Sequence, residues 1–194
     1  MDLFDLGLIF LIVILLILLS WIWPPDSPWA PWWRTNKKTA RSAFKLASVK
    51  KGDIVYELGS GEATALIVAV EEFGARGVGI EIEPLRYLLS KFTVFRRGLG
   101  GDIKLVRGNF FNEDLTGASV VFVYLVPKTL NRLKPKLLKE LKPGTRIISA
   151  VYEIPGGLTN KPSGEELRPK GLIRSLKTAV NKKEIELFLY KIPK

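Results

Sequence analysis

Two acidic residues at the ends of expected strands are the side chains best placed for chemistry in this sequence. Glu57 precedes the turn Gly59-Ser60-Gly61, and Glu81 lies in the next apolar segment. Glycines let the backbone approach a ligand closely, and the helix expected after the turn directs its first N–H groups toward it. A carboxylate at the end of a second strand can accept hydrogen bonds from ribose hydroxyls. A tight turn or a charge at a helix start explains either segment alone, but together they favour a ribose-bearing ligand.

A third polar segment, Arg107-Gly108-Asn109-Phe110-Phe111, follows the third expected strand. An Asn side chain at this position can pair with the edge of an adenine ring, and a Phe can pack on its face. A turn Asn followed by core Phe residues is the alternative explanation. The phosphate-binding pattern GxxxxGK[ST] is absent, and Gly61 is not followed by the spacing of a full GxGxxG motif.

The composition restricts the available chemistry. The chain has no Cys and no His, which excludes disulfides, thiolate metal sites, Cys nucleophiles and Ser-His-Asp catalysis. We therefore expect no metal. The formal net charge of +11 suits an anionic partner, either nucleic acid or an anionic membrane surface, although a solvated Lys-rich surface is the alternative.

Apolar strand-like runs alternate with helical patterns along most of the chain, which predicts a parallel sheet covered on both faces. Ligands of such sheets bind at the carboxyl ends of the strands, where the polar segments above fall. The expected strands are 53–58, 77–82, 103–106, 119–124 and 145–151, with helices at 37–49, 63–73, 84–97 and 127–141, and an antiparallel hairpin formed by 172–180 and 184–192.

The N-terminal segment from Leu6 to Trp23 carries no charge. A helix of this length spans about 27 Å, so we expect a single transmembrane anchor rather than a cleaved signal peptide. Basic residues follow the segment and only acids precede it, which predicts a membrane protein with its catalytic domain in the cytoplasm. The expected division is an anchor at 1–23, a Pro- and Trp-rich linker at 24–36, and a globular domain at 37–194.

The segments Asp53–Gly61, Gly79–Ile82 and Gly108–Phe111 together resemble class I, seven-strand S-adenosylmethionine-dependent methyltransferases. More narrowly, the chain is similar to the protein-lysine methyltransferases that include the archaeal broad-specificity enzyme and the mitochondrial enzymes acting on the ATP synthase c subunit and the adenine nucleotide translocase. The resemblance extends to LKPKLLKELKPGTRIIS at 133–149 and to WAPWWRT at 29–35.

The resemblance implies a Rossmann-like, mostly parallel seven-stranded sheet with helices on both faces and a C-terminal antiparallel hairpin, preceded here by the transmembrane helix. It implies S-adenosylmethionine as cofactor, with S-adenosylhomocysteine as product. The implied cofactor-binding residues are Thr35, Glu57, Leu58, Gly59, Ser60, Gly61, Glu81, Ile82, Asn109 and Phe110. The family loop usually reads G-x-G-Asp-Gly, whereas this chain has Ala63 at the last position, so we expect the loop to avoid a left-handed dihedral there.

Methyl transfer from a sulfonium needs alignment and a neutral amine, whereas free lysine has a pKa of about 10.4. An aromatic channel lowers that pKa by desolvation and attracts methylammonium groups. We expect Trp29, Trp32 and Tyr124 to line such a channel; interface anchoring for the Trp residues and core packing for Tyr124 are the alternatives. Glu153 is a candidate proton acceptor or partner of the substrate lysine, with a surface charge as the alternative. No catalytic base is identified.

The favoured interpretation is a membrane-anchored methyltransferase that modifies the ε-amine of lysine in a membrane or membrane-proximal protein. The expected partners are such a protein with an accessible lysine and an anionic membrane surface, with nucleic acid less favoured. Tyr124-Leu125-Val126-Pro127 lacks the Asn-Pro-Pro-Tyr signature of enzymes that methylate planar nitrogens. The alternatives are a methyltransferase acting on RNA or on a lipid or quinone, and a non-catalytic cofactor-binding module.

Overall fold

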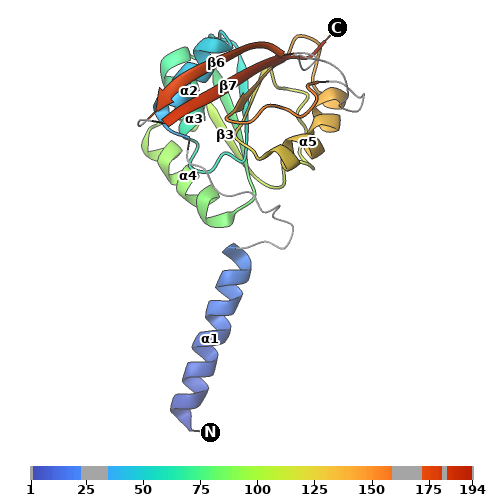
Figure 1. The fold of residues 1–194 in the computed structure, drawn as a ribbon. Helices are drawn as coiled ribbons and strands as arrows, with labels where there is room; N and C mark the ends of the chain where they lie inside the picture. The colour runs from blue at the N-terminus through green and yellow to red at the C-terminus, as the bar shows by residue number, and fades with distance from the viewer. Residues whose placement is uncertain (1, 23–34, 159–171, 181–182, 194) are drawn as a thin grey trace.

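A computed structural model describes residues 2–22, 35–158, 172–180 and 183–193 (Figure 1). One long helix leads to a domain in which strands and helices alternate. The helices are α1 (Leu3–Ile22), α2 (Lys37–Leu46), α3 (Thr64–Phe73), α4 (Pro84–Arg96) and α5 (Pro127–Glu140). The strands are β1 (Ile54–Leu58), β2 (Arg76–Glu81), β3 (Ile103–Arg107), β4 (Val120–Val123), β5 (Arg146–Ala150), β6 (Leu172–Val180) and β7 (Lys183–Lys191).

The seven strands form one sheet in the order β3-β2-β1-β4-β5-β7-β6. Strands β1 to β5 pair in parallel, whereas β7 runs antiparallel to β5 and pairs with β6 as a hairpin. The expected mostly parallel sheet and C-terminal hairpin are therefore confirmed. The chain reverses its direction along the sheet between β1 and β4, and this switch point is where such sheets bind ligands.

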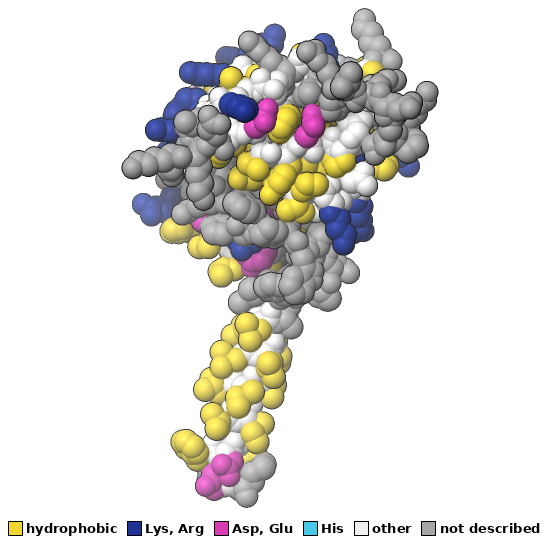
Figure 2. All heavy atoms as spheres, in the orientation of Figure 1, with side chains coloured by type: hydrophobic (Ala, Val, Ile, Leu, Met, Phe, Trp, Pro, Cys, Tyr) yellow, Lys and Arg dark blue, Asp and Glu magenta, His cyan; other side chains and the backbone are white. Residues whose placement is uncertain are grey.

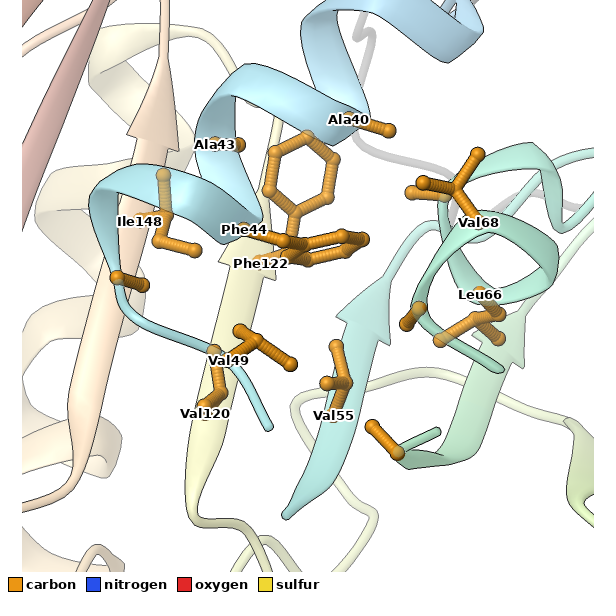
Figure 3. Packing of buried hydrophobic residues seen from close by; sticks show 14 of the residues in the cluster. Ala40, Ala43, Phe44, Val49, Val55, Leu66, Val68, Val120, Phe122 and Ile148 are labelled. Carbon is orange, nitrogen blue, oxygen red and sulfur yellow. The ribbon is translucent and has the colours of Figure 1, made fainter. Parts of the chain in front are cut away.

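Helices cover both faces of the sheet (Figure 1). Helices α2, α3 and α4 contribute to a core with one face, and α5 packs its buried Leu130, Leu133 and Leu137 on the other. In the first core the ring of Phe44 stacks edge-on against Phe122, with centroids 5.8 Å apart (Figure 3). Phe44 also lies edge-on to Phe73 of α3, with ring centroids 5.8 Å apart, so this one ring links α2 and α3 to the sheet.

Two helices begin with side-chain caps that the sequence supplies locally. Asn36 accepts a hydrogen bond from the Thr39 N–H at 2.9 Å and starts α2. Glu83 accepts from the N–H groups of Leu85 and Arg86, at 2.8 and 2.9 Å, and starts α4. Pro84 takes the first position of α4, where its missing N–H costs nothing. Helix α4 therefore begins close behind the end of β2.

The expected transmembrane anchor is not supported. Among the residues that the structure describes, no helix is long and apolar enough to cross a membrane. The prediction of a single-pass membrane protein with a cytoplasmic catalytic domain is therefore wrong. The expected linker falls largely at 23–34, outside the described residues.

A partly buried polar network holds the amino ends of β1, β4 and β5 together. Arg146 forms an ion pair with Asp53 and donates to the carbonyls of Ala47 and Ser48 at 2.8 and 2.9 Å. Ser119 donates to Asp53 at 2.9 Å and accepts from the Ile54 N–H at 2.8 Å. This network lies at the edge opposite the carboxyl ends, so it supports the fold and leaves the other edge open for chemistry.

Candidate functional site

The carboxyl ends of the central strands meet at one edge of the sheet. Leu58 of β1 pairs with Val123 of β4 on one side and with Ile80 of β2 on the other. Val123 in turn pairs with Ser149 of β5. Because these residues share one level, the segments that follow them leave the sheet side by side. The structure therefore brings the glycine-rich turn, Glu81 and the segments after β4 and β5 to a single edge.

The turn after β1 is pinned to the end of β2. The N–H groups of Gly59 and Ser60 both donate to the carbonyl of Ile80, at 2.9 and 3.0 Å. Gly79 lacks the side chain that would prevent this approach: a Cβ at that position would lie 2.8 Å from the Ser60 hydroxyl and 2.8 Å from Leu66. Gly59 and Gly61 adopt left-handed dihedrals, with φ of 77° and 51°.

Glu81 is buried and connects three loops. Its carboxylate accepts hydrogen bonds from the Gly61 N–H at 2.7 Å and from the Glu83 N–H at 2.9 Å. Its backbone carbonyl accepts from the Gly108 N–H at 3.0 Å, which draws the segment after β3 to the same place. Each carboxylate oxygen keeps a further lone pair, so Glu81 can still accept hydrogen bonds from the hydroxyls of a ribose.

Glu57 is the second buried acid, with 4% of its surface exposed. Burial raises its pKa well above the usual range, the Leu66 backbone N–H opposes that shift, and the nearby Glu81 adds to it. Among the described residues, Glu57 Oε2 and the Ser60 hydroxyl are buried without a hydrogen-bond partner. Buried polar groups are nearly always paired, so this turn is built to face a polar ligand. An ammonium group would pair with Glu57 and favour its ionised form.

The prediction that this loop avoids a left-handed dihedral at Ala63 is wrong. Ala63 takes a left-handed conformation, with φ of 59° and ψ of 25°, although we expected the loop to avoid it. Its N–H donates to the Ser60 carbonyl at 2.7 Å, and its carbonyl accepts from the Ile67 N–H at 3.0 Å. Ala63 is also completely buried. These contacts hold the alanine in the conformation that glycine adopts without strain.

The segment after β3 serves local structure first. Asn109 accepts a hydrogen bond from the Phe111 N–H at 3.0 Å, as in an Asx turn. Phe110 is buried in the core beneath α5, and its ring lies 4.7 Å from that of Phe111. Asn109 keeps its amide N–H groups for other partners. The guanidinium of Arg132 lies 4.4 Å from the centroid of the Phe111 ring and covers it.

The remaining expected site residues differ in how deeply they are buried, and two of them lie outside the described residues. Leu58 is core, Ile82 is half-buried directly after β2, and Thr35 is half-buried directly before the cap of α2. Glu153 is exposed in the segment after β5. Trp29 and Trp32 lie outside the described residues.

Two tyrosines follow the carboxyl ends of the neighbouring strands β4 and β5. Tyr124 directly follows β4, and burial raises its pKa, with the nearby Tyr152 hydroxyl adding to the shift. Tyr152 follows Val151, whose φ of 70° is unusual for a β-branched residue. A hydrogen bond of 2.5 Å from Ser149 to the Tyr152 carbonyl closes this turn. Sequence reasoning overlooked Tyr152; its one signal was an aromatic residue just after the fifth expected strand.

Known structures share this architecture. An RNA methyltransferase from Salinibacter ruber, solved with S-adenosyl-L-homocysteine, superposes with a TM-score of 0.70 at 27% identity, covering 83% of this chain and 94% of that one. The B. subtilis M1A22 tRNA methyltransferase TrmK matches with a TM-score of 0.63 at 15% identity, over 81% of this chain and 67% of its own, which shows the fold alone. The fold and the site define an S-adenosylmethionine-dependent methyltransferase.

Sequence comparison identifies the family of methyltransferases to which the chain belongs. The profile described as the ANTKMT methyltransferase domain matches residues 57–161. A protein-lysine N-methyltransferase from Saccharolobus islandicus is 39% identical over 68% of this chain and 81% of its own length. The adenine nucleotide translocase lysine N-methyltransferase of Mus musculus is 26% identical over 64% of this chain and 54% of its own length. The chain belongs to the ANTKMT methyltransferase family, which confirms the resemblance seen in the sequence.

Proposed function

We propose that this methyltransferase modifies the ε-amine of lysine in a protein substrate. The observation that carries the proposal is that Tyr124 and Tyr152 follow the carboxyl ends of β4 and β5, at the same edge of the sheet as the glycine-rich turn after β1. The names of the relatives from S. islandicus and M. musculus, which specify lysine, support the same substrate. The absence of Asn-Pro-Pro-Tyr after β4 agrees with an amine on a flexible side chain.

The buried acids would hold the cofactor. Glu57 and Ser60, which have unpartnered polar atoms, would bind the amino-acid half. Glu81 would accept from the ribose hydroxyls, and Ile82, Asn109 and Phe110 would surround the adenine; Thr35 would close the site from the side of α2. S-adenosylmethionine supplies an electrophilic methyl group when it is bound.

The aromatic residues would prepare the acceptor. A lysine that enters between Tyr124 and Tyr152 leaves water, and desolvation lowers its pKa toward the neutral form that attacks. Aromatic faces also tolerate the methylated, cationic product. Glu153, exposed after β5, would attract the lysine cation before it enters. Alignment by these walls supplies most of the catalysis, because the displacement needs no covalent help from the protein.

Two measurements test the proposal. Calorimetry should show S-adenosylmethionine binding that Glu57→Gln weakens about tenfold to a hundredfold, the loss of a charged hydrogen bond of about 1.5–3 kcal/mol. Glu71→Gln is the control, because Glu71 pairs with Arg97 on the exposed side of α3. Tritiated methyl from the cofactor should then appear in lysine of extracted protein, identified by mass spectrometry.

RNA is a second candidate substrate. The solved RNA methyltransferase that is 27% identical to this chain, together with the net charge of +11, favours it. The labelling experiment separates the candidates when the protein, RNA and lipid fractions are counted apart. Label confined to RNA or to lipid would refute the lysine proposal while leaving the cofactor site intact.

A further inference from the structure

Helix α4 carries an apolar stripe on its exposed side. The stripe follows helical spacing, so its members share one face. It consists of Leu85, Leu88, Leu89, Phe92 and Phe95, which are 51%, 60%, 48%, 59% and 80% exposed. The opposite face of the helix buries Ser90 and Val94 against the domain. Figure 2 shows hydrophobic side chains beside Lys and Arg at the lower left of the domain, over α4. Single exposed apolar residues are ordinary, but a contiguous stripe marks an interaction surface.

Basic residues border the stripe. The sequence of α4 contains Arg86, Lys91 and Arg96 and no acidic residue. The guanidinium of Arg96 lies 5.7 Å from the centroid of the Phe92 ring, and the Lys91 ammonium lies 5.7 Å from the ring of Tyr87. These contacts keep positive charge close to the apolar side chains. The face therefore complements a partner that has apolar and acidic groups together.

The stripe starts at the cofactor site. Glu83, which caps α4, donates its N–H to Glu81 at 2.9 Å, and Glu81 holds the glycine-rich turn through Gly61. A segment lying along α4 would thus have one end at the site. Its length would match the 13 residues of α4, about 20 Å. Helix α1 contacts α4, and the exposed fractions of the five stripe residues are those that remain with α1 in place.

We propose that α4 is the docking surface for the substrate protein, which presents an amphipathic helix with an apolar stripe and flanking acidic residues. This inference rests on the proposed lysine methylation and names the kind of partner. A second copy of the chain fits poorly, because two chains of net charge +11 repel each other. The direct connection of the first turn of α4 to Glu81 favours a substrate protein over a lipid surface.

The test uses a designed peptide and the full chain. The peptide is a labelled amphipathic helix of about 20 residues, with Leu at helical spacing, Glu on both flanks and one Lys beyond its end. Fluorescence anisotropy should show that Leu88→Glu with Phe92→Glu weakens binding at least tenfold. Ile173→Glu is the matched control, because Ile173 is 55% exposed on β6, and it should change affinity less than twofold. Thermal unfolding checks that each variant folds.

Charge exchange tests the electrostatic part. Arg96→Glu should weaken binding of the acidic peptide about threefold to tenfold, and a peptide with Lys in place of its flanking Glu should recover that loss. Unchanged affinity in Leu88→Glu/Phe92→Glu would overturn the proposal. The proposal would also be overturned if the wild-type chain does not bind the peptide but sediments with anionic phosphatidylglycerol vesicles, or if it self-associates through α4 in light scattering.

A short Lys peptide without the helix separates this inference from the function beneath it. If lysine methylation is right and α4 docks the substrate, the double variant methylates the short peptide as the wild type does and loses kcat/KM at least tenfold on the long one. Equal rates on the long peptide reject the docking surface alone. Failure of the wild type to methylate any lysine, with S-adenosylmethionine bound, rejects the proposed function.

Discussion

The left-handed Ala63 allows a direct measurement of strain in the cofactor loop. An L-residue in this conformation costs roughly 1–2 kcal/mol, which Ala63→Gly removes. The same change loses a buried methyl, about 0.8 kcal/mol, and adds about 0.5–1 kcal/mol of chain entropy to the unfolded state. The terms nearly cancel, so we predict that Ala63→Gly changes the free energy of unfolding by less than about 0.5 kcal/mol.

Ala69 supplies the matched control. It lies within α3, the helix that Ala63 precedes, and it is also completely buried, but it has ordinary helical backbone. Ala69→Gly loses the methyl and the entropy with no strain to relieve, about 1.5–2 kcal/mol in all. The two variants should therefore differ by about 1–2 kcal/mol, or roughly 2–8 °C in the midpoint of thermal unfolding measured by calorimetry. Cofactor affinity of Ala63→Gly should stay within about twofold of wild type, because the loop already has this shape.

Equal losses in Ala63→Gly and Ala69→Gly would refute the reasoning. That result would mean that the backbone at position 63 relaxes without cost, and that the hydrogen bonds to Ser60 and from Ile67 do not impose strain. A stabilisation of more than about 2 kcal/mol in Ala63→Gly would show that the strain had been underestimated.

Three further predictions concern the acid pair, the close strand contact and the opposite edge. Without cofactor, burial raises the pKa of Glu57 above its usual value of 4.5, so below pH 4.5 the carboxyl is neutral in both the folded and the unfolded chain and has no effect on the pH dependence of stability. As pH rises above 4.5, the unfolded chain ionises first and the folded state loses stability. Glu57→Gln should therefore reduce the loss of thermal stability with pH above 4.5. Gly79→Ala should cost about 1–3 kcal/mol in urea unfolding through overpacking, whereas Gly100→Ala, with open space around it, should stay within about 0.5 kcal/mol. Asp53→Ala should cost about 1.5–3 kcal/mol by removing the charged hydrogen bond to Arg146, and should leave the cofactor affinity of the folded fraction unchanged.

The order and type of the elements were largely predictable, because they depend on local signals. The expected helix at 84–97 is observed as Pro84–Arg96, and the expected strand at 103–106 as Ile103–Arg107. Proline, glycine and capping residues mark these boundaries in the sequence itself. The prediction of α1 as a membrane span is wrong, because no helix among the described residues is long and apolar enough to cross a membrane.

The site was only partly visible in the sequence. Glu57 and Glu81 could be recognised from their places at strand ends, but their separate roles could not. Only the fold shows that Glu81 holds three loops while Glu57 keeps an unpartnered oxygen. Tyr152 was missed because its position depends on the unusual backbone of Val151, which no local pattern indicates.

The sequence by itself determined the alternation of strands and helices, the glycine-rich turn and the family, because each depends on residues close together in the chain. The tertiary structure alone decided which strand ends share an edge, how closely the turn approaches Gly79, and that α4 keeps its apolar stripe outside the core. These features arise from contacts between distant segments. Ala63 shows the difference most plainly: its own preference is against the left-handed region, and burial with hydrogen bonds to Ser60 and from Ile67 overrides it.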